Sequence, residues 1–223
     1  MTNQALTINP ACFITLEGGE GVGKTTNVNF ITAQLDNAGI PWIKTREPGG
    51  TPLAESIRNL LLANTTETTE APCHLTELLL MFAGRAQHLD QVIRPALAKG
   101  IWVICDRFTD ASYAYQGGGR GQSEALLEQL EQLVHSDLQP DLTLLLDMPI
   151  EAASARVDSR GQQRDRFEQE QWAFFQRVRD AYLQRAHQHP LRFRVVDAAQ
   201  SLPQVQQQVL EYLQPLLDKA LGA

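Results

Sequence analysis

One short segment of the sequence, from Gly18 to Thr25, constrains the fold most strongly. It reads Gly-Gly-Glu-Gly-Val-Gly-Lys-Thr and matches G-x-x-x-x-G-K-T, the pattern of a phosphate-binding loop. An apolar and β-branched run at 12–16 precedes the segment. After it, apolar residues recur at helical spacing, at Val28, Ile31, Leu35 and Ala38. The sequence therefore predicts a strand, a glycine-rich loop and a helix in succession.

The residue types of this loop suit a nucleoside triphosphate. Glycines let backbone N–H groups turn toward phosphate oxygens, and the start of the following helix carries a partial positive charge. We expect Lys24 to contact the β- and γ-phosphates and the Thr25 hydroxyl to bind Mg²⁺. The predicted ATP-binding residues are Gly18, Gly19, Glu20, Gly21, Val22, Gly23, Lys24 and Thr25. A chance glycine-rich turn is the alternative, and the flanking strand and helix argue against it.

Composition limits the class of protein. A chain of 223 residues fits a single domain, 1–223, and its 43% hydrophobic and 20% charged residues are ordinary for a globular protein. The net charge of −7 argues against a nucleic-acid binder with a broad basic surface. No stretch approaches the roughly 20 apolar residues of a membrane span. The cysteines Cys12, Cys73 and Cys105 show no C-x-x-C spacing, so we expect reduced thiols and a cytoplasmic protein.

The rest of the chain alternates between predicted strands and helices. Four more strands are expected at 40–45, 101–105, 141–147 and 193–196. Thr51 and Pro52 predict a helix start, and a long helix is expected from 74 to about 93, with a break or kink at Pro95. Just before the helix start at Thr51, Pro48 follows Glu47; a cis peptide bond there would aim Glu47 into a site, and a plain strand-to-helix loop is the alternative. Alternation of this kind predicts an α/β three-layer fold with a five-stranded parallel sheet.

Several polar residues stand out against these elements. Asp106 ends a buried strand, where a phosphate-loop protein places a carboxylate near Mg²⁺ or its waters; a surface salt bridge is the alternative. Arg85 sits in the middle of a helix, and from the residues alone we favour a surface arginine over a buried anion ligand. The run Gly117–Gly121 predicts a mobile loop.

A second basic cluster lies late in the chain. It comprises Arg156, Arg160, Arg164 and Arg166, with Gly161 among them. A glycine-containing, arginine-rich stretch is what a phosphate-clamping lid requires, so we expect a lid at about 156–167. The alternative is a solvated charged face.

Six segments together give the chain a family resemblance. They are E-G-G-E-G-V-G-K-T-T at 17–26, T-R-E-P-G-G-T at 45–51, F-A-G-R-A-Q at 82–87, C-D-R-F at 105–108, A-Y-Q-G-G-G-R-G at 114–121 and R-G-Q-Q-R-D-R-F-E at 160–168. In this order the chain resembles the thymidylate kinases (dTMP kinases) of the bacterial type, with arginine in the lid, over essentially its whole length. The phosphate loop alone is shared by many families, whereas the later segments are specific.

The resemblance implies a function and its partners. It implies a nucleoside monophosphate kinase-like fold and an enzyme that transfers the γ-phosphoryl group of Mg·ATP to dTMP, giving dTDP and ADP for dTTP biosynthesis. The cofactor implied is Mg²⁺, the partners are ATP and dTMP with no nucleic acid or membrane, and the assembly is a homodimer. The apolar helix around 75–93 is a candidate interface.

The resemblance also implies roles for single residues. Arg85 would orient the thymine base, and Arg107 would contact the dTMP phosphate. The substrate set it implies is Glu47, Arg58, Met81, Phe82, Arg85, Arg107, Ser112, Tyr115, Gln116 and Asp165. Ser112 and Gln116 would read the thymine edge, and Tyr115 would crowd the ribose 2′ position. Whether Met81 or Phe82 covers the base stays open.

The catalytic set implied is Lys24, Arg107, Arg160 and Glu20, with Thr25 and Asp106 at the metal. The phosphate loop has no basic residue between Gly18 and Gly23. The lid must therefore supply positive charge, with Arg160 as first choice and Arg164 as second. Glu20 would bind the sugar hydroxyl or a metal-bound water.

Two other functions remain as alternatives. Another deoxynucleotide or deoxynucleoside kinase would share the loop and lid but differ in the base pocket. A nucleotide-dependent switch would bind the triphosphate without transfer chemistry, and would not need the lid.

Overall fold

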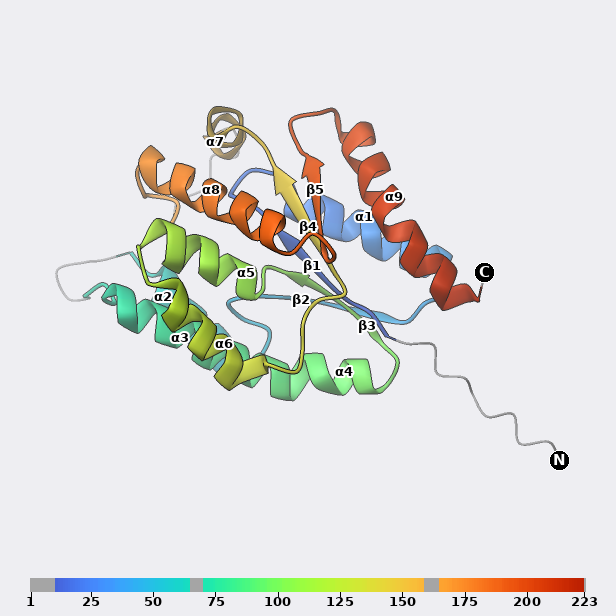
Figure 1. The fold of residues 1–223 in the computed structure, drawn as a ribbon, viewed down its shortest axis with the longest axis horizontal. Coiled ribbons are helices and arrows are strands. Elements are labelled where there is room, and N and C mark those ends of the chain that lie inside the picture. Colours follow the sequence, from blue (N-terminus) through green and yellow to red (C-terminus); the bar gives the residue numbers. More distant parts are fainter. Residues whose placement is uncertain (1–10, 65–69, 159–164, 223) are drawn as a thin grey trace.

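One parallel sheet organises the molecule (Figure 1). The computed structural model describes residues 11–64, 70–158 and 165–222. The strands are β1 (Phe13–Glu17), β2 (Trp42–Arg46), β3 (Trp102–Asp106), β4 (Leu142–Asp147) and β5 (Phe193–Asp197). They lie in the order β2-β3-β1-β4-β5, and every pair is parallel. This sheet is the one predicted from the apolar runs.

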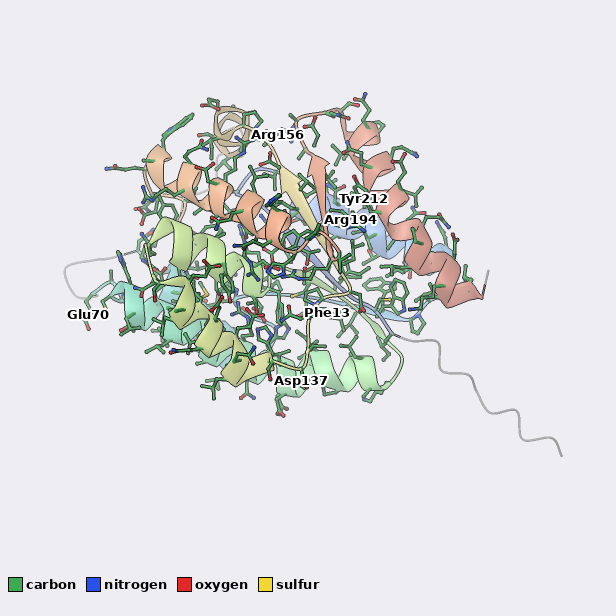
Figure 2. The ribbon with its side chains drawn as sticks, in the orientation of Figure 1. Phe13, Glu70, Asp137, Arg156, Arg194 and Tyr212 are labelled. Carbon is green, nitrogen blue, oxygen red and sulfur yellow. The ribbon has the colours of Figure 1, made fainter. Side chains whose placement is uncertain are left out.

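Helices cover both faces of the sheet (Figure 1). They are α1 (Lys24–Asn37), α2 (Pro52–Leu62), α3 (His74–His88), α4 (Arg94–Ala98), α5 (Thr109–Ser112), α6 (Glu124–His135), α7 (Ile150–Asp158), α8 (Trp172–Gln188) and α9 (Leu202–Leu221), with π-helices η1 (Leu89–Ile93) and η2 (Tyr113–Gly119). The alternation of side chains along β1 separates the layers. Ile14 packs in the core beneath α1 and α9, whereas Phe13 packs against η1 and α4. Figure 2 shows the side chains filling both layers.

The order of the strands places the phosphate loop, which follows β1, beside the segment that follows β3. The chain runs from β1 to one side of the sheet and later returns to the other side, so that the order reverses at β1. In open parallel sheets ligands bind at such a reversal, beyond the carboxyl ends of the strands. Leu16 of β1 pairs with Asp106 of β3, so the segments after these two strands leave the sheet together.

Several local features match the predictions from the sequence. The Thr51 side chain accepts a hydrogen bond from the Ala54 N–H at 3.1 Å and caps α2. The Glu47–Pro48 peptide bond is cis. Cys12 and Cys105 are buried free thiols, as expected of central strands. Among the described helices, none has the length and apolar character to cross a membrane.

A break or kink was expected at Pro95. The α-helical pattern is interrupted just before that residue, where the π-helix η1 joins α3 to α4, and Pro95 lies in the first turn of α4. Proline is tolerated in a first turn because its missing N–H needs no partner there. The glycines at 117–119 are not a mobile loop but part of η2, which packs on α8. A Cβ at Gly118 would lie 2.6 Å from the Ala181 Cβ, so glycine permits this close packing.

Candidate active site

The backbone of the phosphate loop requires its glycines. Gly18, Gly21 and Gly23 have φ of 131°, 78° and 93°, a region that side-chain-bearing residues rarely adopt. A Cβ on Gly18 would collide with the Leu146 carbonyl oxygen, and one on Gly21 with that of Ala153. The loop therefore lies directly against β4 and α7, with no room for side chains at these points.

Two cations converge on this loop. Lys24 is buried, and its Nζ donates to the carbonyl oxygens of Gly18 and Gly19 at 3.2 and 2.7 Å. Arg107 Nη1 donates to the same Gly18 oxygen at 3.0 Å. Burial lowers the pKa of Lys24, and the nearby Arg107 lowers it further. A bound polyphosphate would relieve this concentration of positive charge.

Arg107 joins the loop to the opposite wall of the site. It follows β3 with φ of 70°, the one positive value on a non-glycine residue among those described. Its Nη2 donates to Glu20 Oε1 in the loop and to the Tyr115 hydroxyl at 2.9 Å. Its Nη1 also donates to the Tyr182 hydroxyl at 3.1 Å. One guanidinium group thus contacts β1's loop, η2 and α8.

Glu17, which the sequence reasoning missed, lies beneath this cluster. Its carboxyl is fully buried and accepts hydrogen bonds from the Phe108 N–H at 2.7 Å and the Tyr182 hydroxyl at 2.8 Å. Burial, with the nearby Asp110 carboxylate, raises the pKa of Glu17 to about 8. An acidic residue at the end of an otherwise apolar strand was the available signal.

A cavity lies between the loop, α2, α3 and η2, and its empty volume is about 550 Å³ with the open solvent at its mouth included. The predicted residues that line it are Glu20, Glu47, Arg58, Met81, Arg85, Arg107, Ser112, Tyr115, Gln116 and Asp165. Phe82 is the one member of the predicted substrate set that does not line this cavity. Phe82 is 2% exposed and packs with Leu78, Tyr113 and Leu127 in the core. Its ring lies behind the cavity, 4.6 Å from the Arg85 guanidinium carbon.

Arg85 is a buried cation, not the surface residue that its sequence position favoured. It is 2% exposed, and its Nε donates to Glu47 Oε2 at 2.8 Å. Its Nη2 donates to the Phe108 carbonyl oxygen and to Ser112 Oγ. Arg85 Nη1 has no hydrogen-bond partner in the described part of the chain. Arg85 can be buried because Glu47, which lies 38 residues earlier in the sequence, neutralises its charge.

His88 holds the other oxygen of Glu47. It is fully buried, with Nδ1 3.0 Å from Glu47 Oε1 and Nε2 2.6 Å from Thr45 Oγ1. Burial alone would raise the pKa of Glu47, but Arg85 and His88 together lower it. The sequence reasoning did not single out His88. At the mouth of the cavity, Arg58 Nη1 donates to the Pro48 carbonyl oxygen at 3.0 Å.

The predicted metal ligands offer oxygen atoms near the loop. Asp106 ends β3, and its carboxylate makes no hydrogen bond to another described side chain or N–H; its charge partly opposes the lowering of the Lys24 pKa by burial. Thr25 is exposed in the first turn of α1. No group of three or more acidic, histidine or cysteine side chains that could hold a metal occurs within the described ranges. Mg²⁺ is commonly held by one or two protein oxygens together with substrate phosphates and water, and these two residues fit that chemistry.

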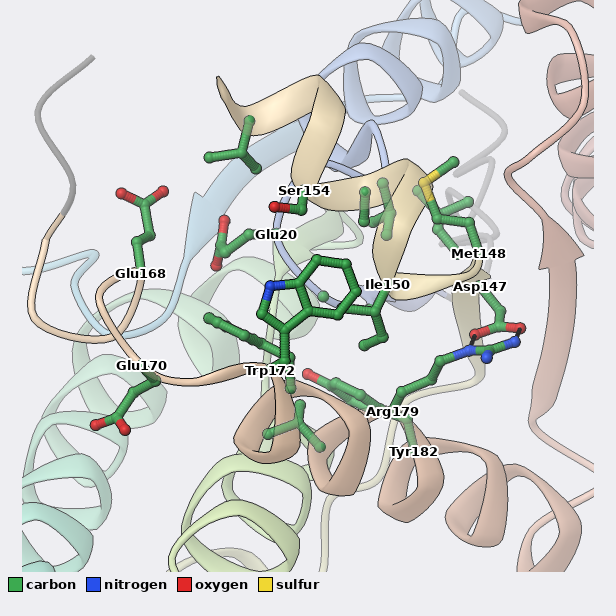
Figure 3. Close-up of a pocket in the computed structure, with 18 of the residues that line it drawn as sticks. Glu20, Asp147, Met148, Ile150, Ser154, Glu168, Glu170, Trp172, Arg179 and Tyr182 are labelled. Carbon is green, nitrogen blue, oxygen red and sulfur yellow. Dashed lines mark hydrogen bonds and ion pairs between the residues drawn. The ribbon is translucent and has the colours of Figure 1, made fainter. Parts of the chain in front are cut away.

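A second cavity lies on the other side of the loop (Figure 3). Its empty volume is about 820 Å³ with the open solvent at its mouth included, its lining is largely apolar, and it lies between the loop, α7 and α8. Trp172 is drawn in its middle, and the Asp147–Arg179 ion pair at one end has an N–O distance of 2.7 Å. Glu20 lines both cavities. The loop is therefore the wall between them.

The predicted lid is described only at its two ends. Arg156 donates to the Ala198 carbonyl oxygen at 3.2 Å. Arg166 donates to the Leu61 carbonyl oxygen at 2.9 Å and to Glu77 Oε2 at 2.6 Å, so it anchors this end of the lid. Arg160 and Arg164 lie outside the described residues, and their roles stay predictions.

Comparison with known proteins identifies the family. The family model of the thymidylate kinases matches residues 16–209. The thymidylate kinase of Chromohalobacter salexigens is 60% identical over 206 residues, which cover 92% of this chain and 96% of that protein. The chain belongs to the thymidylate kinase family. A relative in Ectopseudomonas mendocina is 58% identical over 210 residues, 94% of this chain and 98% of that protein.

A solved structure agrees with the fold. The thymidylate kinase of Ehrlichia chaffeensis matches with a TM-score of 0.73 at 34% identity, covering 92% of this chain and 99% of that one. The predicted fold class and the predicted family, a family of phosphotransferases, are thus confirmed.

The buried carboxyl of Glu17 predicts a dependence of stability on pH. Its folded pKa of about 8 exceeds its ordinary value of 4.5, so between these pH values the folded state binds more protons than the unfolded state. Stability contributed by protonated Glu17 is present at pH 5 and lost as the pH rises to 8, by up to about 1.4 kcal/mol per pH unit. In urea unfolding, the free energy of unfolding of Glu17→Gln should therefore be close to that of the wild type at pH 5 and larger than that of the wild type at pH 8. Glu211→Gln, on the exposed side of α9, is the control and should follow the wild type; a constant gap for Glu17→Gln would refute the assignment.

Proposed function

We propose that this chain transfers the γ-phosphoryl group of ATP to dTMP, giving dTDP and ADP, as a step of dTTP biosynthesis. One observation carries the proposal. The phosphate loop and the arginine-walled cavity share Glu20 and Arg107, so a triphosphate on the loop and a monophosphate in the cavity would meet. Holding two reactants in line is the larger part of phosphoryl-transfer catalysis.

The cavity has cations where a nucleoside monophosphate needs them. Arg107 and Arg58 would bind the phosphate, with Glu47 and Asp165 beside them. In this proposal the dTMP phosphate would replace Glu20 or a tyrosine hydroxyl as a hydrogen-bond acceptor of Arg107, because a phosphate dianion competes strongly for guanidinium N–H groups. Tyr115, held by Arg107, would crowd the sugar and favour its deoxy form.

The far end of the cavity suits a thymine edge. Arg85 and Gln116 both line this cavity, and the buried Nη1 of Arg85 has no hydrogen-bond partner among the described residues. Thymine presents a carbonyl acceptor beside its N3–H donor, which complements such a pair. Met81 lines the cavity, so we assign the apolar cover of the base to Met81 and a supporting position to Phe82.

The mechanism is electrostatic. Lys24 and the loop N–H groups would hold the β- and γ-phosphates, and Thr25 and Asp106 would hold Mg²⁺. The metal, when bound, neutralises charge on the bridging phosphate oxygens. The dTMP phosphate is already ionised at pH 7, so no strong general base is needed. Lys24, Arg107 and Arg160 are the proposed catalytic cations, with Glu20 positioning the acceptor through the sugar hydroxyl or a metal-bound water.

We also propose a cytoplasmic homodimer. Leucines Leu53 and Leu60 of α2 and Leu75 and Leu79 of α3 are each about half exposed or more, and α2 packs on α3. Apolar side chains gathered on adjacent helices are typical of an interface. Sedimentation equilibrium tests this, and a monomer at micromolar concentration would contradict it.

A panel of acceptors tests the reaction itself. With Mg·ATP and each of dTMP, dUMP, dCMP, UMP and thymidine, we expect the highest kcat/KM with dTMP. The loss for dUMP, which lacks one methyl group, should be about 10-fold to 200-fold. Preference for thymidine over dTMP would replace this proposal with a nucleoside kinase. ATP hydrolysis that does not depend on any acceptor would replace it with a nucleotide switch.

Arg160 should act on the transfer step. We expect Arg160→Ala to lower kcat by about 10³-fold, because a clamping arginine stabilises charge that develops only in the transition state. The dTMP KM should change little. Arg164→Ala is the comparison and should cost less. A rise in KM with kcat unchanged would make Arg160 a binding residue instead.

A further inference from the structure

Glu77 of α3 is a buried carboxylate outside the predicted site. Its side chain is 0% exposed and has three donors around it. Oε1 accepts from Gln116 Nε2 at 2.9 Å and from Arg120 Nε at 3.3 Å, and Oε2 accepts from Arg166 Nη2 at 2.6 Å. All three contacts are donations to the carboxylate, which acts purely as an acceptor.

That carboxylate determines which way the Gln116 amide points. An amide group has a donor end and an acceptor end of nearly the same size, so packing alone does not choose between them. Because Glu77 accepts from Gln116, the Nε2 end must face α3. The one hydrogen bond of the Gln116 side chain to a described residue is made through Nε2, and Gln116 lines the cavity between the phosphate loop, α2, α3 and η2. The acceptor end is thus the one left for a ligand.

We propose that Glu77 is a positioning residue that sets base specificity through the orientation of Gln116. The inference rests on the proposed function. With Glu77 in place, the cavity presents the acceptor end of Gln116, and the guanidinium group of Arg85 lines the same cavity. Thymine and uracil match this pair with an N3–H donor and a C4 carbonyl. Cytosine has the opposite polarity at both atoms, an N3 acceptor and an N4 donor.

The neighbours of Glu77 keep the carboxylate in this orientation. Arg120 is clamped by Glu170 through Nη1 and lies 4.7 Å from the Phe174 ring centre. Arg166 is fixed by its bond to the Leu61 carbonyl oxygen. These two cations also compensate the charge of a carboxylate that would otherwise be costly to bury. Rotation of Glu77 would break three contacts at once.

Glu77→Gln is the variant that reverses the polarity. Its carbonyl oxygen must face Arg166, the shortest of the three contacts, so its NH₂ group points toward Gln116. Gln116 then turns its own oxygen toward position 77 and presents NH₂ to the cavity. We expect the ratio of kcat/KM for dCMP to that for dTMP to rise about 10- to 100-fold over the wild type. The change should come mainly from a raised KM for dTMP, with kcat changing less.

Two matched controls separate positioning from general support. Glu170→Gln removes the other carboxylate on Arg120 but does not touch Gln116, so the dCMP-to-dTMP ratio should stay at the wild-type value. In a Gln116→Leu background there is no amide to turn, and adding Glu77→Gln should no longer change the ratio. A ratio unchanged in Glu77→Gln, or a change that persists in the Gln116→Leu background, would overturn the inference.

A variant of a buried charged residue can fail to fold, so a second one is needed. Glu77→Gln/Arg120→Gln removes one partner cation together with the carboxylate and keeps Arg166, which still holds the carbonyl oxygen at position 77. It should raise the same ratio, and an unchanged ratio in a folded double variant would overturn the inference. The wild-type enzyme separates this question from the proposed function. If it does not phosphorylate dTMP, the function fails; if it does and the ratio is unmoved in the variants, only the role of Glu77 fails.

Discussion

The contacts of Arg107 connect the two halves of the site. Its guanidinium group donates to Gly18 and Glu20 of the phosphate loop on one side and to Tyr115 and Tyr182 on the other. The strand order makes this possible, because β1 and β3 are neighbours and both segments leave the sheet at their carboxyl ends. Without that adjacency, a triphosphate on the loop and a monophosphate in the cavity would have no shared wall.

Three buried carboxyl groups, of which Glu17 is protonated below about pH 8, support the walls of the cavity. Glu47 holds Arg85, Glu77 holds Gln116, and Glu17 holds the Tyr182 hydroxyl that contacts Arg107. Buried charges are poor sources of stability, since desolvation offsets much of their attraction. Their shared effect is orientation: each fixes a polar group that lines or borders the cavity. The site is therefore pre-organised by buried groups, two of which, Glu17 and Glu77, do not line the cavity.

The features that could be predicted from the sequence are those that local residue patterns determine. Periodicity gave the strands, glycine spacing gave the phosphate loop, and Thr51 gave the start of α2. Features that depend on distant partners were missed or misjudged. Arg85 was placed at the surface because its neutralising Glu47 lies 38 residues away. Glu77 reads as one polar residue in a helix, because its partners Gln116 and Arg166 are 39 and 89 residues away.

The glycines of η2 show a related difficulty. A glycine run predicts flexibility when only the chain itself is considered, but here glycine is required by the approach of α8. Local sequence cannot show what packs against a segment. The family resemblance supplied what the local pattern lacked, because its YQGGGRG and DR segments predicted that Gln116 and Arg107 share one site, and both residues line the same cavity.

The most direct test of this account is the affinity of dTMP for the Arg107→Lys variant, measured by calorimetry beside the wild type. Lysine keeps the positive charge but cannot make the paired contacts of a guanidinium group to phosphate, Glu20 and Tyr115. The account predicts that dTMP binds at least about 10-fold more weakly to the variant. An unchanged dissociation constant would contradict the claim that Arg107 joins the loop to the acceptor cavity.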